Sequence, residues 1–264
     1  MTVAEAYQLE RHDQVAWLWL NRPELHNAFD DQLIAKLTAE LTSLTADSDL
    51  RALVIAGRGA SFSAGADLNW MRRMASASHE QNRDDALGLA NLMRTLAFFP
   101  KPTVARVHGA AFGGGVGLVA CCDIVVAADH AKFGLTEVKL GLVPAVMSPY
   151  VVEAIGPRQA RRYFLTGESF DAATAQQLGL VHQVVPADQL DAVLNQQLEM
   201  LLRAGPAAVR VAKQLVYGIR GTDDQRQSKM DAHTSDLIAS LRVSAEGQEG
   251  ITAFLEKRAP LWIG

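Results

Sequence analysis

Cysteine is scarce in this chain of 264 residues, and the two cysteines present, Cys121 and Cys122, are neighbours. Adjacent cysteines cannot form an ordinary structural disulfide, and two of them do not make a metal-ligand set. Both lie in an apolar stretch, where a thiol packs as a small hydrophobic group. We therefore expect no disulfide, no metal site and a reducing, cytoplasmic location.

Long hydrophobic runs are also missing. Charged residues or glycines interrupt each apolar stretch before it reaches the roughly 20 residues that cross a bilayer, so we expect no transmembrane helix and no membrane partner. The first residues, Met1–Tyr7, lack the basic and apolar regions of a secretory leader, and we do not expect secretion. Excess positive charge is absent as well. The formal net charge of −4 argues against nucleic-acid binding, but it leaves room for an anionic small ligand.

What the sequence does contain is an alternation of strand and helix patterns, which predicts an α/β core. Residues 7–11 and 15–20 read as a hairpin, and further strands are expected at 51–56, 103–107 and 123–127. Helices are expected over 30–44, with Asp30 or Asp31 near the N-cap, and over 84–99. The first of these helices places the following residues on one face: Leu33, Ile34, Leu37, Leu41 and Leu44.

The last part of the chain reads differently. After Pro186 the pattern is almost wholly helical, with breaks expected at Gly205 and Gly247. The length allows one domain or a domain with an appended helical region. We divide the chain into a core of residues 1–200 and a helical region of residues 201–264.

Two segments with glycines carry the strongest chemical signal: Ser61–Leu68 (SFSAGADL) and His108–Gly117 (HGAAFGGGVG). Small residues let a backbone N–H approach a ligand, and two such groups can hold an oxygen that becomes anionic in a transition state. The second segment opens an apolar stretch that reads as a buried helix, whose N-terminus would add free N–H groups and a positive dipole end. Together they predict an oxyanion hole.

With Phe133–Pro144 (FGLTEVKLGLVP) following, this order of segments resembles the crotonase (enoyl-CoA hydratase/isomerase) superfamily. The resemblance runs from WLNRP at 19–23 to FLEKR at 254–258. It implies a spiral of ββα units whose last helices mediate trimer formation, with two trimers often stacking into a hexamer. It also implies an acyl-CoA thioester as substrate, with no further cofactor.

The resemblance assigns roles to individual residues. Ala66 and Gly114 match the positions whose amides form the oxyanion hole, and Glu137 matches a glutamate that faces the substrate. The expected contacts to coenzyme A and substrate are Leu25, Ala64, Gly65, Asp67, Leu68 and Gly117. Because Glu24 stands where the family often has a basic residue, Lys257, from a neighbouring subunit, is the candidate cation. Taken alone, each loop could be a tight turn, and Glu137 could be a solvated partner of Lys139.

The main departure from the family is Gly117, where hydratases of the two-glutamate type carry a second glutamate. This glycine and Pro144–Tyr150 (PAVMSPY) look like the branch of methylglutaconyl-CoA hydratases. The leading hypothesis is therefore hydration of a branched or carboxylated 2-enoyl-CoA, as in leucine breakdown, with Arg72 or Arg73 as a possible partner of a distal carboxylate. A Δ3-Δ2 enoyl-CoA isomerase, with Glu137 as single proton shuttle, and a catalytically silent CoA-binding scaffold are the alternatives.

A dinucleotide site is a further alternative, because glycines 113–117 follow a strand and an acid, Glu137, comes twenty residues later. In a dinucleotide-binding fold the acid ends the second strand. Glu137 lies well beyond the strand at 123–127, so this interpretation is the weaker one.

Overall fold

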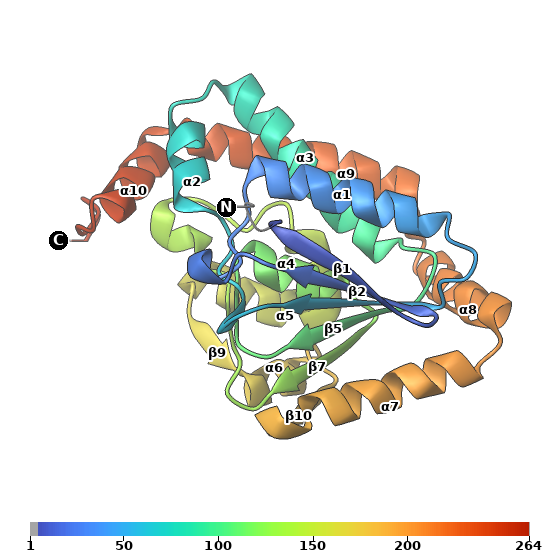
Figure 1. Ribbon diagram of the computed structural model, residues 1–264. Helices are drawn as coiled ribbons and strands as arrows, with labels where there is room; N and C mark the ends of the chain where they lie inside the picture. The colour runs from blue at the N-terminus through green and yellow to red at the C-terminus, as the bar shows by residue number, and fades with distance from the viewer. Residues whose placement is uncertain (1–4, 264) are drawn as a thin grey trace.

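The computed structural model describes residues 5–263 (Figure 1). Met1–Ala4, part of the segment that showed no leader pattern, lie outside the described residues. Within residues 5–263, every helix is too short or too polar to span a bilayer.

The described strands form two sheets. The larger has the order β1-β2-β3-β5-β7-β10, in which only β1 and β2 pair antiparallel. Its strands are β1 (Tyr7–His12), β2 (Val15–Leu20), β3 (Ala52–Gly57), β5 (Thr103–Val107), β7 (Ile124–Ala128) and β10 (Gln183–Val185). The smaller has the order β4-β6-β8-β9, with β4 (Ser61–Ser63), β6 (Ala110–Phe112), β8 (Lys132–Gly134) and β9 (Ser169–Asp171).

The chain passes from the larger to the smaller sheet three times, from β3 to β4, from β5 to β6 and from β7 to β8. A helix follows each passage, so the predicted spiral of ββα units is confirmed. Strands β4, β6 and β8 are parallel, and their carboxyl ends therefore lie at one edge of the smaller sheet. This edge brings together the loops that precede α2, α4 and η2. The glycines at 113–117 follow β6 of this second sheet, which rules out the dinucleotide interpretation.

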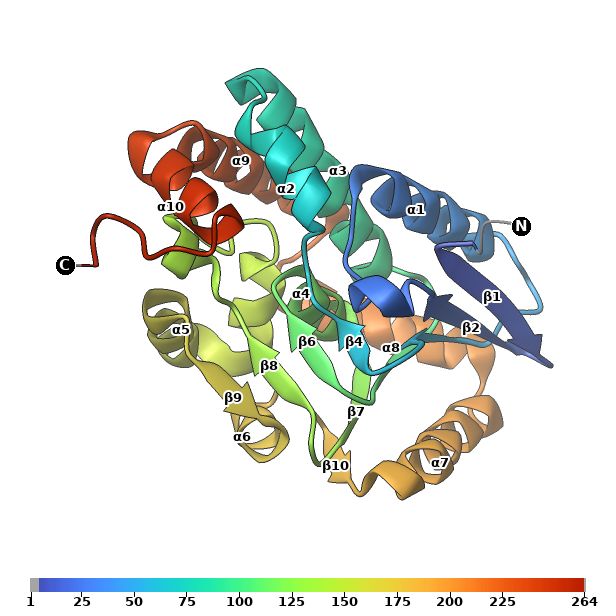
Figure 2. The same cartoon turned by 60° about the vertical axis from the view of Figure 1, so that its left-hand side comes forward.

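Helices cover both faces of the larger sheet (Figures 1 and 2). Helix α7 packs its buried leucines on one face, while α1, α3 and α9 lie over the other. The helices are η1 (Pro23–Leu25), α1 (Asp31–Thr45), α2 (Leu68–Ala75), α3 (His79–Ala97), α4 (Gly114–Cys121), η2 (Glu137–Leu140), α5 (Ser148–Thr166), α6 (Ala172–Leu178), η3 (Ala187–Gln189), α7 (Leu190–Arg203), α8 (Pro206–Ile219), α9 (Asp224–Arg242) and α10 (Ala245–Leu255).

Most local predictions are confirmed. The five apolar residues expected on one face of α1 are all buried, and the Asp30 carboxylate caps this helix by accepting from the Leu33 N–H at 2.8 Å. The hairpin forms, and the strand at 103–107 has the expected bounds. Cys121 and Cys122 are free and buried, and burial raises the pKa of both thiols.

The helical end of the chain differs in one respect. The break at Gly205 is confirmed, but the break at Gly247 is wrong, because Gly247 lies inside α10. The interruption comes just before, where the Ser244 hydroxyl caps α10 by accepting from the Gly247 N–H at 3.0 Å. A short local hydrogen bond, rather than the glycine, therefore sets the boundary.

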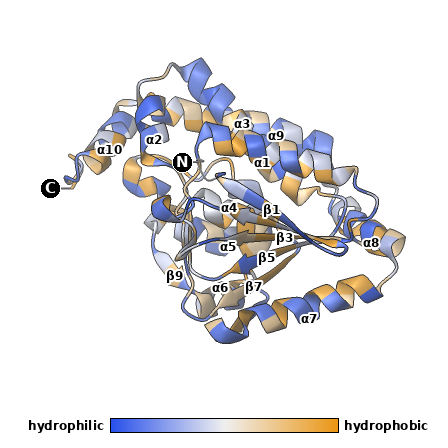
Figure 3. Cartoon of the chain, viewed as in Figure 1, coloured by the Kyte–Doolittle hydropathy of each residue, from blue (hydrophilic) through white to orange (hydrophobic). Residues whose placement is uncertain are grey.

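No residue of α8 is fully buried, and its ribbon in Figure 3 includes residues with hydrophobic colours. Val211, Leu215, Val216 and Ile219 are each more than half exposed. Helix α9 instead packs along α3, and α10 contacts α2 and η2. The division at residue 200 and the trimer or hexamer stay predictions.

Candidate active site

A cavity of about 1060 Å³ opens where the two glycine segments meet α2, η2 and α10. Ala66, Gly114 and Glu137 all line it. So do the residues expected to contact coenzyme A: Leu25, Ala64, Gly65, Asp67 and Leu68. The resemblance assigned ten residues to this site. Eight of them line the cavity, and the other two, Gly117 and Lys257, do not.

The two glycine loops touch through their backbones. Gly65 has φ +88°, and a Cβ built on it would lie 2.9 Å from the Phe112 carbonyl oxygen. Gly113 has φ +50° and faces Gly65 across the same contact. Both φ values lie in the left-handed region that favours glycine. The close approach of the loops therefore requires glycine on both sides.

The amides of Ala66 and Gly114 are free to bind a ligand. Ala66 lies in a parallel bridge with Phe29, in which Phe29 N–H donates to the Gly65 oxygen and Asp67 N–H donates to the Phe29 oxygen, each at 2.7 Å. Since successive peptide groups alternate in direction along a strand, the Ala66 N–H points to the other side. Gly114 begins α4, where the first N–H groups have no partner within the helix. Neither amide donates a hydrogen bond within residues 5–263.

Glu137 is the first residue of η2 and directs its carboxylate toward the glycine loops. Its Oε1 lies 3.0 Å from the position that a Cβ on Gly113 would take. Its Oε2 is buried and has no hydrogen-bond partner within the described chain. This burial raises the pKa of Glu137 to about 7. Near neutral pH the side chain can therefore accept or release a proton.

The alternative of a solvated Glu137 paired with Lys139 is wrong. Among the described residues Glu137 has no ion pair, and the Lys139 side chain lies instead against Gly167. An unpaired carboxyl facing a cavity is typical of a group that acts on a ligand, because a structural carboxylate is normally hydrogen-bonded.

Gly117 does not line the cavity, because other side chains lie between them. It is buried in α4, and a Cβ there would lie 2.8 Å from Met93 Cε and 2.9 Å from Met147 Cβ. Met93 is fully buried, while Met147 lines the cavity. The expected substrate contact at Gly117 is thus replaced by Met147, because the two methionines fill the space in front of the glycine.

Lys257 is exposed just after α10 and adopts φ +55°. It is not among the residues that line the cavity, and its role across a subunit boundary stays a prediction. Four other cations line the cavity: Arg72, Lys139, Arg242 and Arg258. Arg258 is held by Glu249 through two hydrogen bonds, at 2.6 and 2.9 Å.

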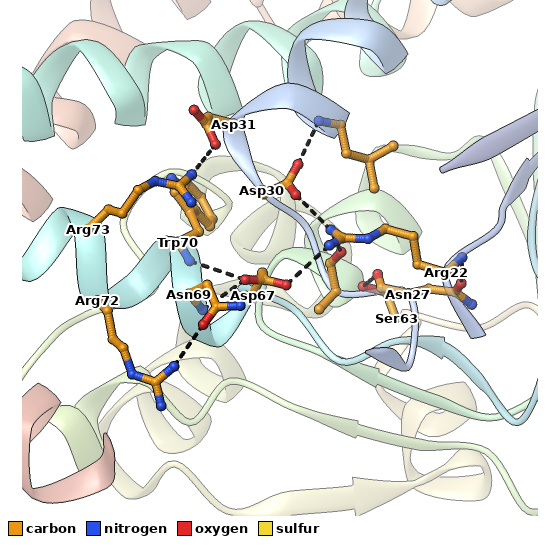
Figure 4. A network of polar contacts seen from close by, with 12 residues as sticks. Arg22, Asn27, Asp30, Asp31, Ser63, Asp67, Asn69, Trp70, Arg72 and Arg73 are labelled. Atoms are coloured by element: carbon orange, nitrogen blue, oxygen red, sulfur yellow. Dashed lines mark hydrogen bonds and ion pairs between the residues drawn. The ribbon is translucent and has the colours of Figure 1, made fainter. Parts of the chain in front are cut away.

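A polar network fixes the first glycine loop (Figure 4). Arg22 bridges Asp30 at 2.9 Å and Asp67 at 3.3 Å, and the Asp67 carboxylate also caps α2 by accepting from Asn69 N–H at 2.8 Å. Arg73 on the same helix points away toward Asp31. The network ties η1, α1 and α2 to the loop that carries the Ala66 amide.

Helix α10 holds the turn that carries Glu137. A Cβ on Gly250 would lie 2.2 Å from the Leu140 oxygen, and a Cβ on Gly141 would lie 2.8 Å from the Glu246 oxygen. The backbones of α10 and η2 are thus in direct contact. Side chains of any size at these two glycines would separate them.

Sequence reasoning missed a polar group on the wall of the cavity where α2, α3 and α9 meet. Trp70, Asp85 and Arg242 line it together, and Arg242 Nη1 donates to Asp85 Oδ2 at 2.9 Å. Asp85 and Arg242 are 157 residues apart. No local spacing could have paired them, because they meet only through the packing of α9 on α3.

Comparison with known proteins agrees with this site. The family model described as "Enoyl-CoA hydratase/isomerase" matches residues 10–264. An enoyl-CoA hydratase structure from Shewanella pealeana is 45% identical with a TM-score of 0.80, covering 98% of this chain and 96% of that one.

Two curated relatives have more specific names. The 2,3-dehydroadipyl-CoA hydratase of Escherichia coli is 35% identical over 96% of each chain. The mevalonyl-coenzyme A hydratase sidH of Aspergillus fumigatus is 37% identical over 93% of this chain and 90% of its own. With the spiral fold, the paired amides and Glu137 in place, the chain belongs to the enoyl-CoA hydratase/isomerase family, which is the crotonase superfamily.

Proposed function

We propose that this protein adds water to the double bond of a branched or carboxylated 2-enoyl-CoA, of the methylglutaconyl-CoA type. The observation that carries the proposal is the buried, unpaired carboxyl of Glu137 beside two free amides on one cavity. Membership of the family supports a thioester as the substrate. The reaction needs no metal and no nicotinamide.

The chemistry follows from the geometry. The thioester oxygen binds to the N–H groups of Ala66 and Gly114, which stabilise the negative charge of an enolate. Glu137 accepts a proton from water as the water oxygen bonds to C3 of the substrate. The C2–C3 π electrons form the C1–C2 double bond of the enolate while the carbonyl π electrons move to the thioester oxygen, and Glu137 then returns the proton to C2 as the carbonyl forms again. One carboxyl group thus removes and restores the same proton.

The coenzyme A part is proposed to lie along the first glycine loop and η1. Leu25 and Leu68 are exposed apolar residues at the cavity mouth, where they can pack on the pantetheine arm or the adenine. Arg72 and Arg258 supply positive charge on the same cavity. Coenzyme A phosphates require such charge on a protein with a net charge of −4.

The acyl preference is supported by what replaces the second carboxylate. Met93 and Met147 fill the place in front of Gly117, so this position offers no second acid to hold the attacking water. A substrate with a bulky or anchored acyl group would confine that water better than a short straight chain. The names of the E. coli and A. fumigatus relatives, for dehydroadipyl and mevalonyl thioesters, agree with an acyl group that carries polar substituents.

A panel of crotonyl-CoA, 3-methylglutaconyl-CoA and a 3-enoyl-CoA tests the proposal in water labelled at its oxygen. We expect label in the product of the methylglutaconyl thioester and a lower kcat/KM for crotonyl-CoA. Glu137→Gln, which keeps the shape of the side chain, serves as the inactive control. Migration of the 3-enoyl double bond, without label in any product, would instead assign the protein as an isomerase. Binding of all three thioesters without turnover would assign it as a scaffold.

A further inference from the structure

The wall of the cavity where α2, α3 and α9 meet carries a buried ion pair. Arg242 and Asp85 line the cavity, and their side chains are 15% and 8% exposed. The cavity residues beside them on α3 and α9 are Ala86, Leu89 and Ile238, and Ile251 follows on α10. This pair is not adjacent in sequence to the two amides or to Glu137.

The hydrogen bonds of this pair leave one edge of the guanidinium unused. Arg242 donates through Nη1 to Asp85 Oδ2 at 2.9 Å and to Asn82 Oδ1 at 3.3 Å. The other Asp85 oxygen accepts from Trp70 Nε1 at 2.7 Å. Within residues 5–263, neither Nε nor Nη2 of Arg242 donates to a protein group and neither is fully buried, while the residue itself lines the cavity.

The free edge has the geometry that a carboxylate prefers. Nε and Nη2 present two parallel N–H bonds, which bind both oxygens of one carboxylate. An apolar acyl chain placed there would instead remove water from these donors without replacing it, and unpaired buried donors are costly. Asp85 and Trp70 fix the orientation of the guanidinium from its other side.

From this geometry we propose that Arg242 is a specificity-determining residue that binds a carboxylate at the distal end of the acyl group. The inference rests on the proposed function for its substrate class, and it names the side chain that selects that class. It replaces the earlier expectation for Arg73, which points away to Asp31, and for Arg72, which is hydrogen-bonded to Asn69 at 2.8 Å.

The pair also explains why Asp85 does not repel such a substrate. Burial raises the pKa of the Asp85 carboxyl, and the adjacent guanidinium opposes that rise. Both Asp85 oxygens already accept hydrogen bonds from Arg242 and Trp70, so its charge is partly satisfied by donors. A second carboxylate would meet the opposite edge of the guanidinium rather than Asp85 itself.

Binding of two saturated thioesters, adipyl-CoA and hexanoyl-CoA, tests the inference by calorimetry on the full chain. They have equal chain length and differ only at the distal end. We expect the wild-type protein to bind adipyl-CoA about tenfold to a hundredfold more tightly, which is the range for hydrogen bonds to a charged group. Arg242→Met should abolish this preference and leave hexanoyl-CoA binding equal or stronger, whereas Arg242→Lys should keep part of it.

Two further variants control for folding and for general charge. Arg242→Met leaves Asp85 buried without its cation, so Arg242→Met combined with Asp85→Asn provides a neutral wall if the single variant unfolds. Arg73→Met removes an arginine of α2 whose side chain lies outside the cavity, and it should change neither affinity. In assays with 2,3-dehydroadipyl-CoA and 2-hexenoyl-CoA, the Arg242 variants should show a higher KM for the carboxylated substrate alone.

Equal affinity of the wild-type protein for the two thioesters would overturn the inference. An equal loss of affinity for both thioesters in the double variant, Arg242→Met with Asp85→Asn, would overturn it as well. Because the thioesters are saturated, this result is independent of turnover. A protein that discriminates them but hydrates no enoyl-CoA would contradict the proposed function and keep the inference. A protein that hydrates crotonyl-CoA and methylglutaconyl-CoA but binds adipyl-CoA and hexanoyl-CoA equally would support the proposed function and contradict the inference.

Discussion

Replacement of Glu137 by glutamine should weaken catalysis and stabilise the fold at the same time. The carboxyl is buried, its Oε2 has no partner, and its pKa is raised from 4.5 to about 7. One pKa unit corresponds to about 1.4 kcal/mol, so ionisation of Glu137 in the folded protein costs about 3 kcal/mol more than in the unfolded chain. The wild-type fold carries this cost at neutral and alkaline pH.

The sign of the pH dependence follows from proton linkage. Between the two pKa values the folded protein holds a proton on Glu137 that the unfolded chain has released, so the folding free energy becomes less favourable as the pH rises. Glutamine does not titrate. The stability of Glu137→Gln relative to wild type should therefore increase by about 3 kcal/mol between about pH 4 and about pH 8.

Denaturant unfolding of both proteins at matched concentration, across that pH range, measures this difference. Glu80→Gln, at an exposed position of α3, is the matched control and should show no such trend. In parallel, kcat for Glu137→Gln should fall by about 10²–10⁴, as is typical of losing general acid–base catalysis. In the wild type, kcat/KM for hydration should rise with pH through about 7, where Glu137 loses its proton. A stability difference that does not change with pH would refute the reasoning, because the carboxyl would then not be desolvated.

Three other predictions concern the surroundings of this group. Gly117→Glu should lower the melting temperature, because its side chain would collide with Met93 and Met147, and it should not raise hydration of crotonyl-CoA; a stable and more active variant would show that the methionines move aside. Gly113→Ala should reduce kcat strongly with a folded protein by circular dichroism, since the new Cβ would lie 3.0 Å from Glu137 Oε1 and at a φ of +50° that disfavours alanine; unchanged kcat would separate this contact from the reaction. Sedimentation should give a trimer or a dimer of trimers, because α8 exposes its apolar side chains, whereas a monomer at all concentrations would contradict this assembly.

Local chemistry made much of the fold predictable. The apolar face of α1 and its cap at Asp30 follow from spacings within a few residues, and the structure shows both. The glycine loops were also recognisable, because close backbone contact and left-handed φ at Gly65 and Gly113 leave little choice of residue. The boundary near Gly247 was missed, since the cap at Ser244 decides it.

Long-range packing set the limit of prediction for the site. The sequence shows that Gly117 has no side chain but not that Met93, from α3, and Met147 fill the space in front of it. Likewise, Asp85 and Arg242 pair across helices that are far apart in the chain. Such contacts depend on how α3, α4 and α9 pack, which no residue pattern within one segment reports.

The backbone contact between α10 and the turn of Glu137 makes a distant helix part of the proposed site. All of the groups assigned to the proposed chemistry lie within residues 66–137, yet the turn that presents the carboxylate rests on Gly250, far along the chain. We expect a nascent or truncated chain that ends before α10 to have both amides but a hydrated Glu137, with the ordinary acidity of a surface carboxyl. Docking of α10 on this turn would then itself raise the pKa of Glu137 to the range in which it can exchange a proton.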